Sequence, residues 1–286
     1  MAELEYAKRG LVGVLTPQAN TTVEPEFRIL WPAGVTMLNA RLTSKKKKME
    51  ERLIDYTNQI EVTLDQFANA PLQAVAFGCT GASYLIGQEK ETQICERIKK
   101  NKGFNFITAA RAVTDSFNAL GAKKIGLVSP YPASLTEISV TYWQNAGFEV
   151  AEVSSAYNDA SDFHPIYSLR AGSSNEALLS LQNKEIDAIV MLGTGMPTLQ
   201  PILDCQHWDG PPVTSCMLSL AWRTMLHIDG KEPNAENMLA WSNGVEWQDR
   251  MKINSCWLIN FDQITINGTV FTGAKHSNNI KMITLI

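Results

Sequence analysis

A cysteine lies at the point in the sequence where a buried strand is expected to end and a helix to begin. Residues 75–83 read VAFGCTGAS, an apolar run that leads into Gly78-Cys79-Thr80-Gly81. The N–H groups and the dipole of a helix N-terminus stabilise a thiolate, so this position would bring the pKa of Cys79 toward neutrality. A thiol with such a pKa can act as a nucleophile or exchange a proton with a substrate. Cys79 is therefore the candidate catalytic residue.

Four further cysteines fit structural roles better than chemical ones. They show no CxxC or CxxH spacing, so they predict neither a zinc site nor a disulfide framework, and buried free thiols of this kind are common in cytoplasmic proteins. The histidines have no spacing typical of a metal site, and no glycine-rich phosphate loop occurs. The lysine run at 45–48 is typical of a solvated surface. The four cysteines are Cys95, Cys205, Cys216 and Cys256.

Composition excludes several classes of partner. The chain has 286 residues, of which 45% are hydrophobic and 19% charged, and a net charge of −4. This charge gives no general attraction for nucleic acid or an anionic membrane, so a small-molecule ligand is expected. The charged N-terminus lacks the apolar run of a signal peptide, and no stretch of about 18 apolar residues suits a membrane span. We expect a cytoplasmic protein.

The chain contains two copies of one unit. Residues 8–17 and 123–130 both read as basic residues, a buried strand and a Ser/Thr-Pro turn. In each half a second apolar strand follows and ends in Thr-Gly, at 74–81 and 188–195. The spacing between the two turns is nearly the same in both halves, which indicates an internal duplication.

Segments with helical periodicity separate these strands. Apolar residues at helical spacing predict an amphipathic helix over 51–67, and similar patterns predict helices over 109–120, 133–145 and 175–182. Alternating strands and helices predict parallel sheets with helices on both faces. From about Asn254 the sequence changes character: residues 257–261 and 264–271 suggest extended chain, with an Asn-Gly turn that predicts a hairpin.

The four strand-end turns are expected to meet. Ligands of open parallel sheets bind beyond the carboxyl ends of the strands, where loops lead into helix N-termini. If the two halves face each other, both Ser/Thr-Pro turns and both Thr-Gly turns converge on one cleft. Each turn taken alone is also what an ordinary strand-to-helix connection requires.

The chain resembles the aspartate/glutamate racemase superfamily, and within it the maleate cis-trans isomerase and arylmalonate decarboxylase branch. The resemblance runs in order through nearly the whole chain, from residues 13–22 and 78–81 through 129–131, 192–199 and 212–222. It implies an α/β fold of two similar doubly wound parallel-sheet lobes, related by a pseudo-twofold axis with the active site between them. We expect residues 1–115 plus about 222–286 to form the first lobe and 116–221 the second.

The resemblance also implies cofactor-independent chemistry without a metal. Family members can place one cysteine from each lobe on opposite faces of the substrate. The first matches Cys79, whereas the position of the second is occupied by Gly193. A threonine hydroxyl cannot replace a thiol as a general acid without help, so two-cysteine racemisation is disfavoured and a one-cysteine reaction is expected.

Several residues are expected to bind the substrate carboxylates. Asn20 matches an asparagine of the maleate isomerases, although a turn or helix N-cap role would also suit it. The resemblance implies that Tyr131 hydrogen-bonds a carboxylate, although packing beside Pro130 would also explain the ring. The N–H groups and hydroxyls of the two Thr-Gly turns would serve a carboxylate or an enediolate without an arginine. These turn residues are Thr80, Gly81, Thr194 and Gly195.

The leading interpretation is an isomerase that acts on a small carboxylate or dicarboxylate through the Cys79 thiolate. Addition of the thiolate to an alkene makes the bond single, so that it can rotate before the thiolate leaves. The alternatives are a decarboxylase in which Cys79 is the proton donor, and a carboxylate-binding protein without turnover, because of Gly193. Asn158 and His164 fall where the family has another loop near the site, and no role is assigned to them. Relatives are commonly dimers, so a homodimer is expected.

Overall fold

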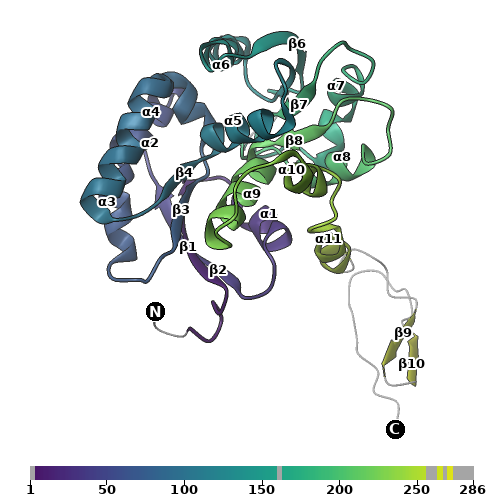
Figure 1. The fold of residues 1–286 in the computed structure, drawn as a ribbon, viewed down its shortest axis with the longest axis horizontal. Coiled ribbons are helices and arrows are strands. Elements are labelled where there is room, and N and C mark those ends of the chain that lie inside the picture. The colour runs from purple at the N-terminus through teal and green to yellow at the C-terminus, as the bar shows by residue number, and fades with distance from the viewer. Residues whose placement is uncertain (1–3, 160–162, 256–262, 267–268, 273–286) are drawn as a thin grey trace. The chain divides into compact units, whose positions relative to one another are not determined.

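Two four-stranded parallel sheets of the same topology form the framework of the protein (Figure 1). The computed structural model describes residues 4–159, 163–255, 263–266 and 269–272. The sheet orders are β2-β1-β3-β4 and β6-β5-β7-β8, so the second sheet repeats the strand order of the first. The strands are β1 (Gly10–Pro17), β2 (Val35–Leu42), β3 (Ala74–Phe77), β4 (Phe106–Thr108), β5 (Lys124–Ser129), β6 (Glu149–Ser155), β7 (Ala188–Met191) and β8 (Val213–Ser215). The predicted two-lobe α/β fold is confirmed.

The inner strands of both sheets are mostly apolar and buried, apart from the exposed Lys124 at the start of β5. β1, β3 and β7 have no residue exposed to solvent, as expected for strands covered on both faces. Gly13 in β1 and Gly126 in β5 occupy the same place in the two repeats. An added Cβ would lie 2.8 Å from the Phe67 ring at Gly13 and 2.6 Å from Ile186 at Gly126. The duplicated glycine therefore lets the covering segments approach the sheet closely.

Helices lie on both sides of the sheets and at their ends. The predicted helices at 109–120 and 133–145 are confirmed with those bounds, whereas the segment 51–67 is divided at Gln59 into three short pieces and the helix at 175 ends early. The helical segments are α1 (Val23–Leu30), α2 (Met49–Asn58), α3 (Ile60–Leu64), η1 (Asp65–Phe67), α4 (Thr80–Lys102), α5 (Ala109–Leu120), α6 (Ala133–Asn145), η2 (Ala171–Ser174), α7 (Asn175–Leu179), α8 (Leu199–Asp204), α9 (Cys216–Ile228), α10 (Ala235–Ser242) and α11 (Gln248–Ser255).

The helix that follows the last strand of each sheet packs against the other sheet. α5 leaves β4 and contacts β7 and β8, while α9 leaves β8 and contacts β3 and β4. Aromatic rings fill the junction between α4, α5 and α6: Trp143 is fully buried and lies edge-on to Phe117 and to Tyr84. Such aromatic pairs add about 0.5–1.5 kcal/mol each beyond the area that they bury. The two sheets are thereby held in one compact unit, residues 1–248.

Residues 249–286 form a second unit. It contains two strands of the predicted hairpin, because β9 (Gln263–Ile266) pairs antiparallel with β10 (Thr269–Thr272); the predicted Asn-Gly turn lies outside the described residues. The extended stretch predicted at 257–261 lies outside the described residues. No helix among the described residues is long and apolar enough to cross a membrane.

Candidate active site

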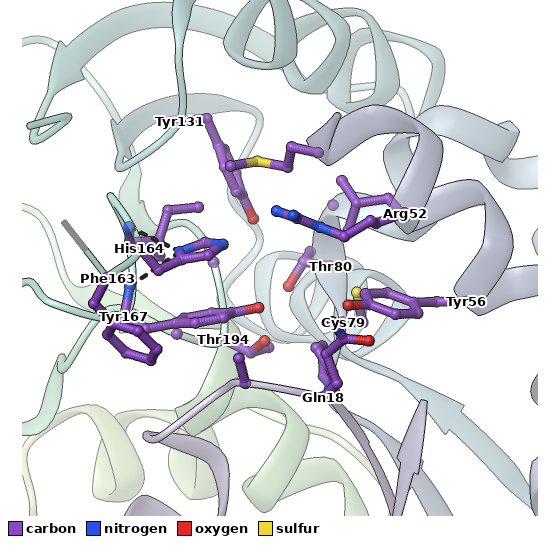
Figure 2. A pocket seen from close by; sticks show the side chains of 18 residues that line it. Gln18, Arg52, Tyr56, Cys79, Thr80, Tyr131, Phe163, His164, Tyr167 and Thr194 are labelled. Atoms are coloured by element: carbon purple, nitrogen blue, oxygen red, sulfur yellow. Dashed lines mark hydrogen bonds between the residues drawn. The ribbon is translucent and has the colours of Figure 1, made fainter. Parts of the chain in front are cut away.

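One cavity lies at the carboxyl ends of the inner strands of both sheets. Its volume is about 170 Å³, and the turns after β1, β3, β5 and β7 all contribute to its wall, together with one face of α2 and the segment 163–167 (Figure 2). The four turns that the repeat predicts to converge do so. The lining residues from these turns are Pro17, Gln18, Ala19, Cys79, Thr80, Gly81, Tyr131, Gly193, Thr194 and Gly195.

Cys79 lines the cavity at the start of α4, immediately before the first helical residue. Only 3% of the residue is exposed. Burial raises the pKa of its thiol to about 12, and a hydrogen bond from the Ala82 N–H lowers it by less. The expectation of a pKa near neutrality is wrong, because desolvation of the thiolate outweighs the effect of the helix N-terminus. Cys79 is therefore a neutral thiol at physiological pH.

A second thiol lies behind the wall of the cavity. Cys216 is the first residue of α9 and is fully buried. Burial raises the pKa of its thiol to about 11, and contacts with the Thr80 hydroxyl, the Gly193 backbone and the Tyr84 hydroxyl lower it by less. The sequence analysis predicts a structural role for Cys216, and its complete burial agrees with that role. The structure adds that it touches two residues of the cavity wall.

Thr194 and Asn20 connect three of the turns. The Thr194 hydroxyl donates to the Gly78 carbonyl at 2.7 Å, so its proton is already used within the protein. The Asn20 side chain donates to the Thr194 carbonyl at 3.3 Å and accepts from the N–H groups of Thr22 and Val23 at 2.8 and 3.2 Å. Asn20 is 2% exposed and lies behind Thr194, outside the cavity lining. It holds the turn after β1 against the turn after β7.

Gly193 has a backbone conformation that differs from that of Cys79, its counterpart in the repeat. Its φ is +82°, whereas that of Cys79 is −147°. An added Cβ at Gly193 would lie 3.0 Å from Pro130 Cγ and 3.2 Å from Tyr131 Oη. A side chain here would be strained by the left-handed backbone and crowded by the tyrosine. The two turns are therefore equivalent in sequence position but not in shape.

Tyr131 projects its hydroxyl into the cavity (Figure 2). The residue is 5% exposed, and its ring lies edge-on to that of Tyr84 at 6.1 Å. Burial raises the pKa of Tyr131 well above its ordinary value, so the hydroxyl stays protonated and can donate a hydrogen bond.

The structure brings to the cavity three residues that the sequence did not identify: Arg52, Tyr56 and Tyr167. It also brings His164, which lies in the segment that the resemblance places near the site. One face of α2 supplies Met49, Arg52, Leu53 and Tyr56, which follow helical spacing. Leu53 and Tyr56 belong to the apolar face of the helix predicted over 51–67, and Arg52 lies next to that face in the sequence. The sequence analysis predicted that the four turns could bind a carboxylate without an arginine; Arg52 lies on α2, outside those turns.

His164 and Tyr167 form a stacked pair at the opposite side of the cavity from α2. Their ring centroids are 3.8 Å apart with an interplanar angle of 11°. The Nδ1 atom of His164 accepts hydrogen bonds from the N–H groups of Ile166 and Tyr167 at 3.2 and 3.4 Å. Burial, with a smaller contribution from Arg52, lowers the pKa of His164 to about 4, so the ring is neutral and carries its proton on Nε2. Gly195 admits the tyrosine, because an added Cβ would lie 2.4 Å from the Tyr167 ring.

Among the described residues, no group of three or more His, Cys, Asp or Glu side chains is arranged to hold a metal ion. The polar side chains that line the cavity carry a thiol, tyrosine and threonine hydroxyls, the Gln18 amide, one neutral imidazole and one guanidinium. This set offers a nucleophile or proton donor and several hydrogen-bond donors for an anion.

Comparison with known proteins identifies the family. The family model described as arylmalonate decarboxylase matches residues 12–239, which include both sheets and every residue of the cavity wall. The chain belongs to the arylmalonate decarboxylase family. The resemblance drawn from the sequence motifs is thereby confirmed.

Individual relatives in this family are maleate isomerases. The enzyme from Geobacillus stearothermophilus is 26% identical over 254 residues, covering 82% of this chain and 98% of that protein. The crystal structure of the maleate isomerase Iso from Pseudomonas putida S16 superposes with a TM-score of 0.70 at 25% identity, covering 77% of this chain and 93% of that one. These comparisons confirm the prediction of an enzyme, either an isomerase or a carboxy-lyase.

A third relative has been solved with an intermediate bound covalently to a cysteine. The Nocardia farcinica maleate cis-trans isomerase has been solved as a variant with a cysteine-to-serine replacement and a covalently bound succinylcysteine intermediate. It superposes with a TM-score of 0.68 at 23% identity and covers 77% of this chain and 93% of that one. At this level of identity the likeness concerns the fold.

Proposed function

We propose that the protein is a cofactor-independent cis-trans isomerase of a small unsaturated dicarboxylate, with Cys79 as its single catalytic thiol. The observation that carries the proposal is the position of Cys79: it is the one thiol among the described residues that line the cavity, and Thr80 and Gly81 follow it at the N-terminus of α4. The maleate isomerases among the relatives, and the covalently bound succinylcysteine intermediate of one of them, support a step in which a cysteine sulfur bonds to a substrate carbon.

The neutral state of the thiol determines how the reaction begins. The sulfur bonds to one alkene carbon, and the thiol proton passes to a carboxylate oxygen of the substrate. The alkene electron pair moves toward that carboxyl group, so that a protonated enediolate forms. Addition in this form avoids a separate buried thiolate, which the raised pKa of Cys79 disfavours. N–H groups at the start of α4 and the Tyr131 hydroxyl would stabilise the enediolate.

The second half of the reaction reverses the first. The carbon–carbon bond, now single, rotates; the electron pair then returns, the alkene forms again, the carbon–sulfur bond breaks and the sulfur recovers its proton. No proton is added to carbon, so one thiol is sufficient. In this proposal Asn20 acts by holding Thr194, and Gly193 leaves room for the Tyr131 hydroxyl.

Decarboxylation is the second candidate, and one observation favours it. Burial raises the pKa of the Cys79 thiol to about 12, so the thiol keeps its proton at neutral pH, as a proton donor must. A substituted malonate would lose carbon dioxide, and the resulting enediolate would take the Cys79 proton at its α carbon. Bulk solvent would then reprotonate the thiolate.

Proton NMR in D2O distinguishes the two reactions. We expect wild type to convert maleate or methylmaleate to the trans isomer without deuterium at the alkene carbons, and Cys79→Ala to be inactive. Cys205→Ala is the matched control, because this cysteine is also buried but does not line the cavity. Loss of the carboxyl group from a malonate with deuterium at the α carbon would favour the decarboxylase, and full activity of Cys79→Ala would eliminate both candidates.

A further inference from the structure

Arg52 places a positive charge in the cavity. It lies one turn into α2, is half-buried, and donates from Nη1 to the Lys47 carbonyl at 3.2 Å. Figure 2 shows its guanidinium directed into the space between Tyr131, His164 and Thr80. In the described part of the chain it is the one fully charged side chain that lines the cavity, and no Asp or Glu accompanies it there.

The guanidinium has no anionic partner among the residues that the structure describes. Within the described residues, no carboxylate lies at ion-pair distance from Arg52, whereas Arg9, Arg41 and Arg223 are each paired with one. A guanidinium is charged at every physiological pH, and partial burial without a counter-ion is unfavourable. The Arg52 charge is therefore available to an anion that enters from solvent.

His164 faces the guanidinium from the other side of the cavity. Two backbone N–H groups bind its Nδ1 atom, so the neutral ring presents an N–H at Nε2, and stacking on Tyr167 fixes the plane of the ring. Figure 2 shows this ring and the guanidinium directed toward the same space. Together they supply a planar, charged fork and a neutral donor, a combination suited to a carboxylate.

We propose that Arg52 and the His164 Nε2–H form a subsite for the second carboxylate of the substrate, and that this subsite selects dicarboxylates over monocarboxylates. The first carboxylate would then lie against the turn at Thr80 and Gly81, with the reacting carbon beside Cys79. This inference deepens the proposed isomerase function and rests on it for the reaction, but the selection itself is a binding property. A monocarboxylate would leave the guanidinium unpaired, so it would bind less tightly than a diacid of the same chain length.

The test compares the binding of two saturated acids with four carbons, succinate and butyrate. Neither has an alkene, so their binding does not depend on turnover. Isothermal titration calorimetry is carried out at low salt on wild type, Arg52→Gln, Arg52→Lys, His164→Gln and the control Arg28→Gln, whose side chain is exposed on α1. Circular dichroism melting curves establish that each variant is folded.

We expect wild type to bind succinate at least tenfold more tightly than butyrate. Arg52→Gln should weaken succinate binding by about 30-fold and change butyrate binding by less than about threefold, as the loss of one charge-assisted hydrogen-bonded pair predicts. Arg52→Lys should retain part of the preference, because it keeps the charge without the fork. His164→Gln should give a smaller loss, and Arg28→Gln should behave like wild type.

The proposal is overturned if wild type does not prefer succinate, or if folded Arg52→Gln keeps the wild-type preference. Failure of the isomerase proposal has a different signature: succinate selectivity that depends on Arg52, together with no conversion of any unsaturated diacid in the NMR assay. The opposite pattern, conversion of maleate with no succinate preference, would leave the isomerase in place and remove the subsite.

Discussion

The Thr194 hydroxyl donates a 2.7 Å hydrogen bond to the Gly78 carbonyl, and this buried bond joins the turn after β7 to the turn before α4. Thr194→Val keeps the shape of the side chain but leaves the carbonyl without this donor. We expect the free energy of unfolding to fall by about 1–3 kcal/mol, the usual cost of an unsatisfied buried group. Urea denaturation measures it. Thr194→Ser retains the hydroxyl and should lose much less; a loss in Thr194→Ser as large as that in Thr194→Val would contradict the larger role expected for the hydroxyl.

Alkylation of Cys79 should accelerate continuously with pH. Burial raises the pKa of this thiol to about 12, so the thiolate fraction rises about tenfold per pH unit over the whole range from 7 to 10. Iodoacetamide labelling, followed by mass spectrometry of the peptide that contains Cys79, gives the rate. Cys256 lies outside the described residues, so the measurement is made in a Cys256→Ser background. A plateau below pH 9 would show that the thiol ionises more easily than its burial implies.

Gly193 should not accept the second cysteine of the family. The added Cβ of Gly193→Cys meets Pro130 and the Tyr131 hydroxyl, and the φ of +82° disfavours any side chain. We expect a loss of about 1–2 kcal/mol in the free energy of unfolding from the left-handed backbone alone, with Gly193→Ala losing a similar amount. Thermal denaturation of both variants provides the comparison. A Gly193→Cys protein of wild-type stability that gained racemase activity would contradict this account.

The duplicated framework could be predicted from the sequence because its signals are local. Gly13 and Gly126 stand at matching points of two apolar runs, and both runs are central strands of the sheets. The turn that carries Cys79 comes directly after such an apolar run. The sequence therefore also predicts that Cys79 lies at the carboxyl edge of a sheet.

The Cys79 pKa and the roles of Arg52 and Asn20 could not be predicted in the same way. The pKa depends on how completely the other lobe covers the thiol, which is a property of tertiary packing. Arg52 reaches the cavity from a helix that precedes Cys79 by a long connection, and no turn motif marks it. Asn20 matched a substrate-binding pattern, yet it lies behind Thr194, because local sequence does not show which neighbour a buried amide will meet.

Glu26 connects the lobes through a contact that depends on pH. It lies on α1, is 5% exposed, and accepts a hydrogen bond from the Thr198 N–H at 2.7 Å, just before α8. Burial raises its pKa from 4.5 to about 7, and the hydrogen bonds from Thr198 and Leu199 lower it by less. The folded protein therefore holds a proton that the unfolded chain releases at lower pH.

This linkage fixes the sign of the effect on stability. The contribution of protonated Glu26 to the free energy of unfolding is fully present below pH 4.5. It is lost as the pH rises to about 7, because only the unfolded state releases the proton over that range. The free energy of unfolding falls by at most about 3 kcal/mol between pH 4.5 and 7. We expect Glu26→Gln to remove this fall in urea denaturation between pH 4.5 and 8, while keeping the oxygen that accepts from Thr198. The exposed Glu236→Gln on α10 should retain the wild-type slope, and a Glu26→Gln profile identical to wild type would place the titrating group elsewhere.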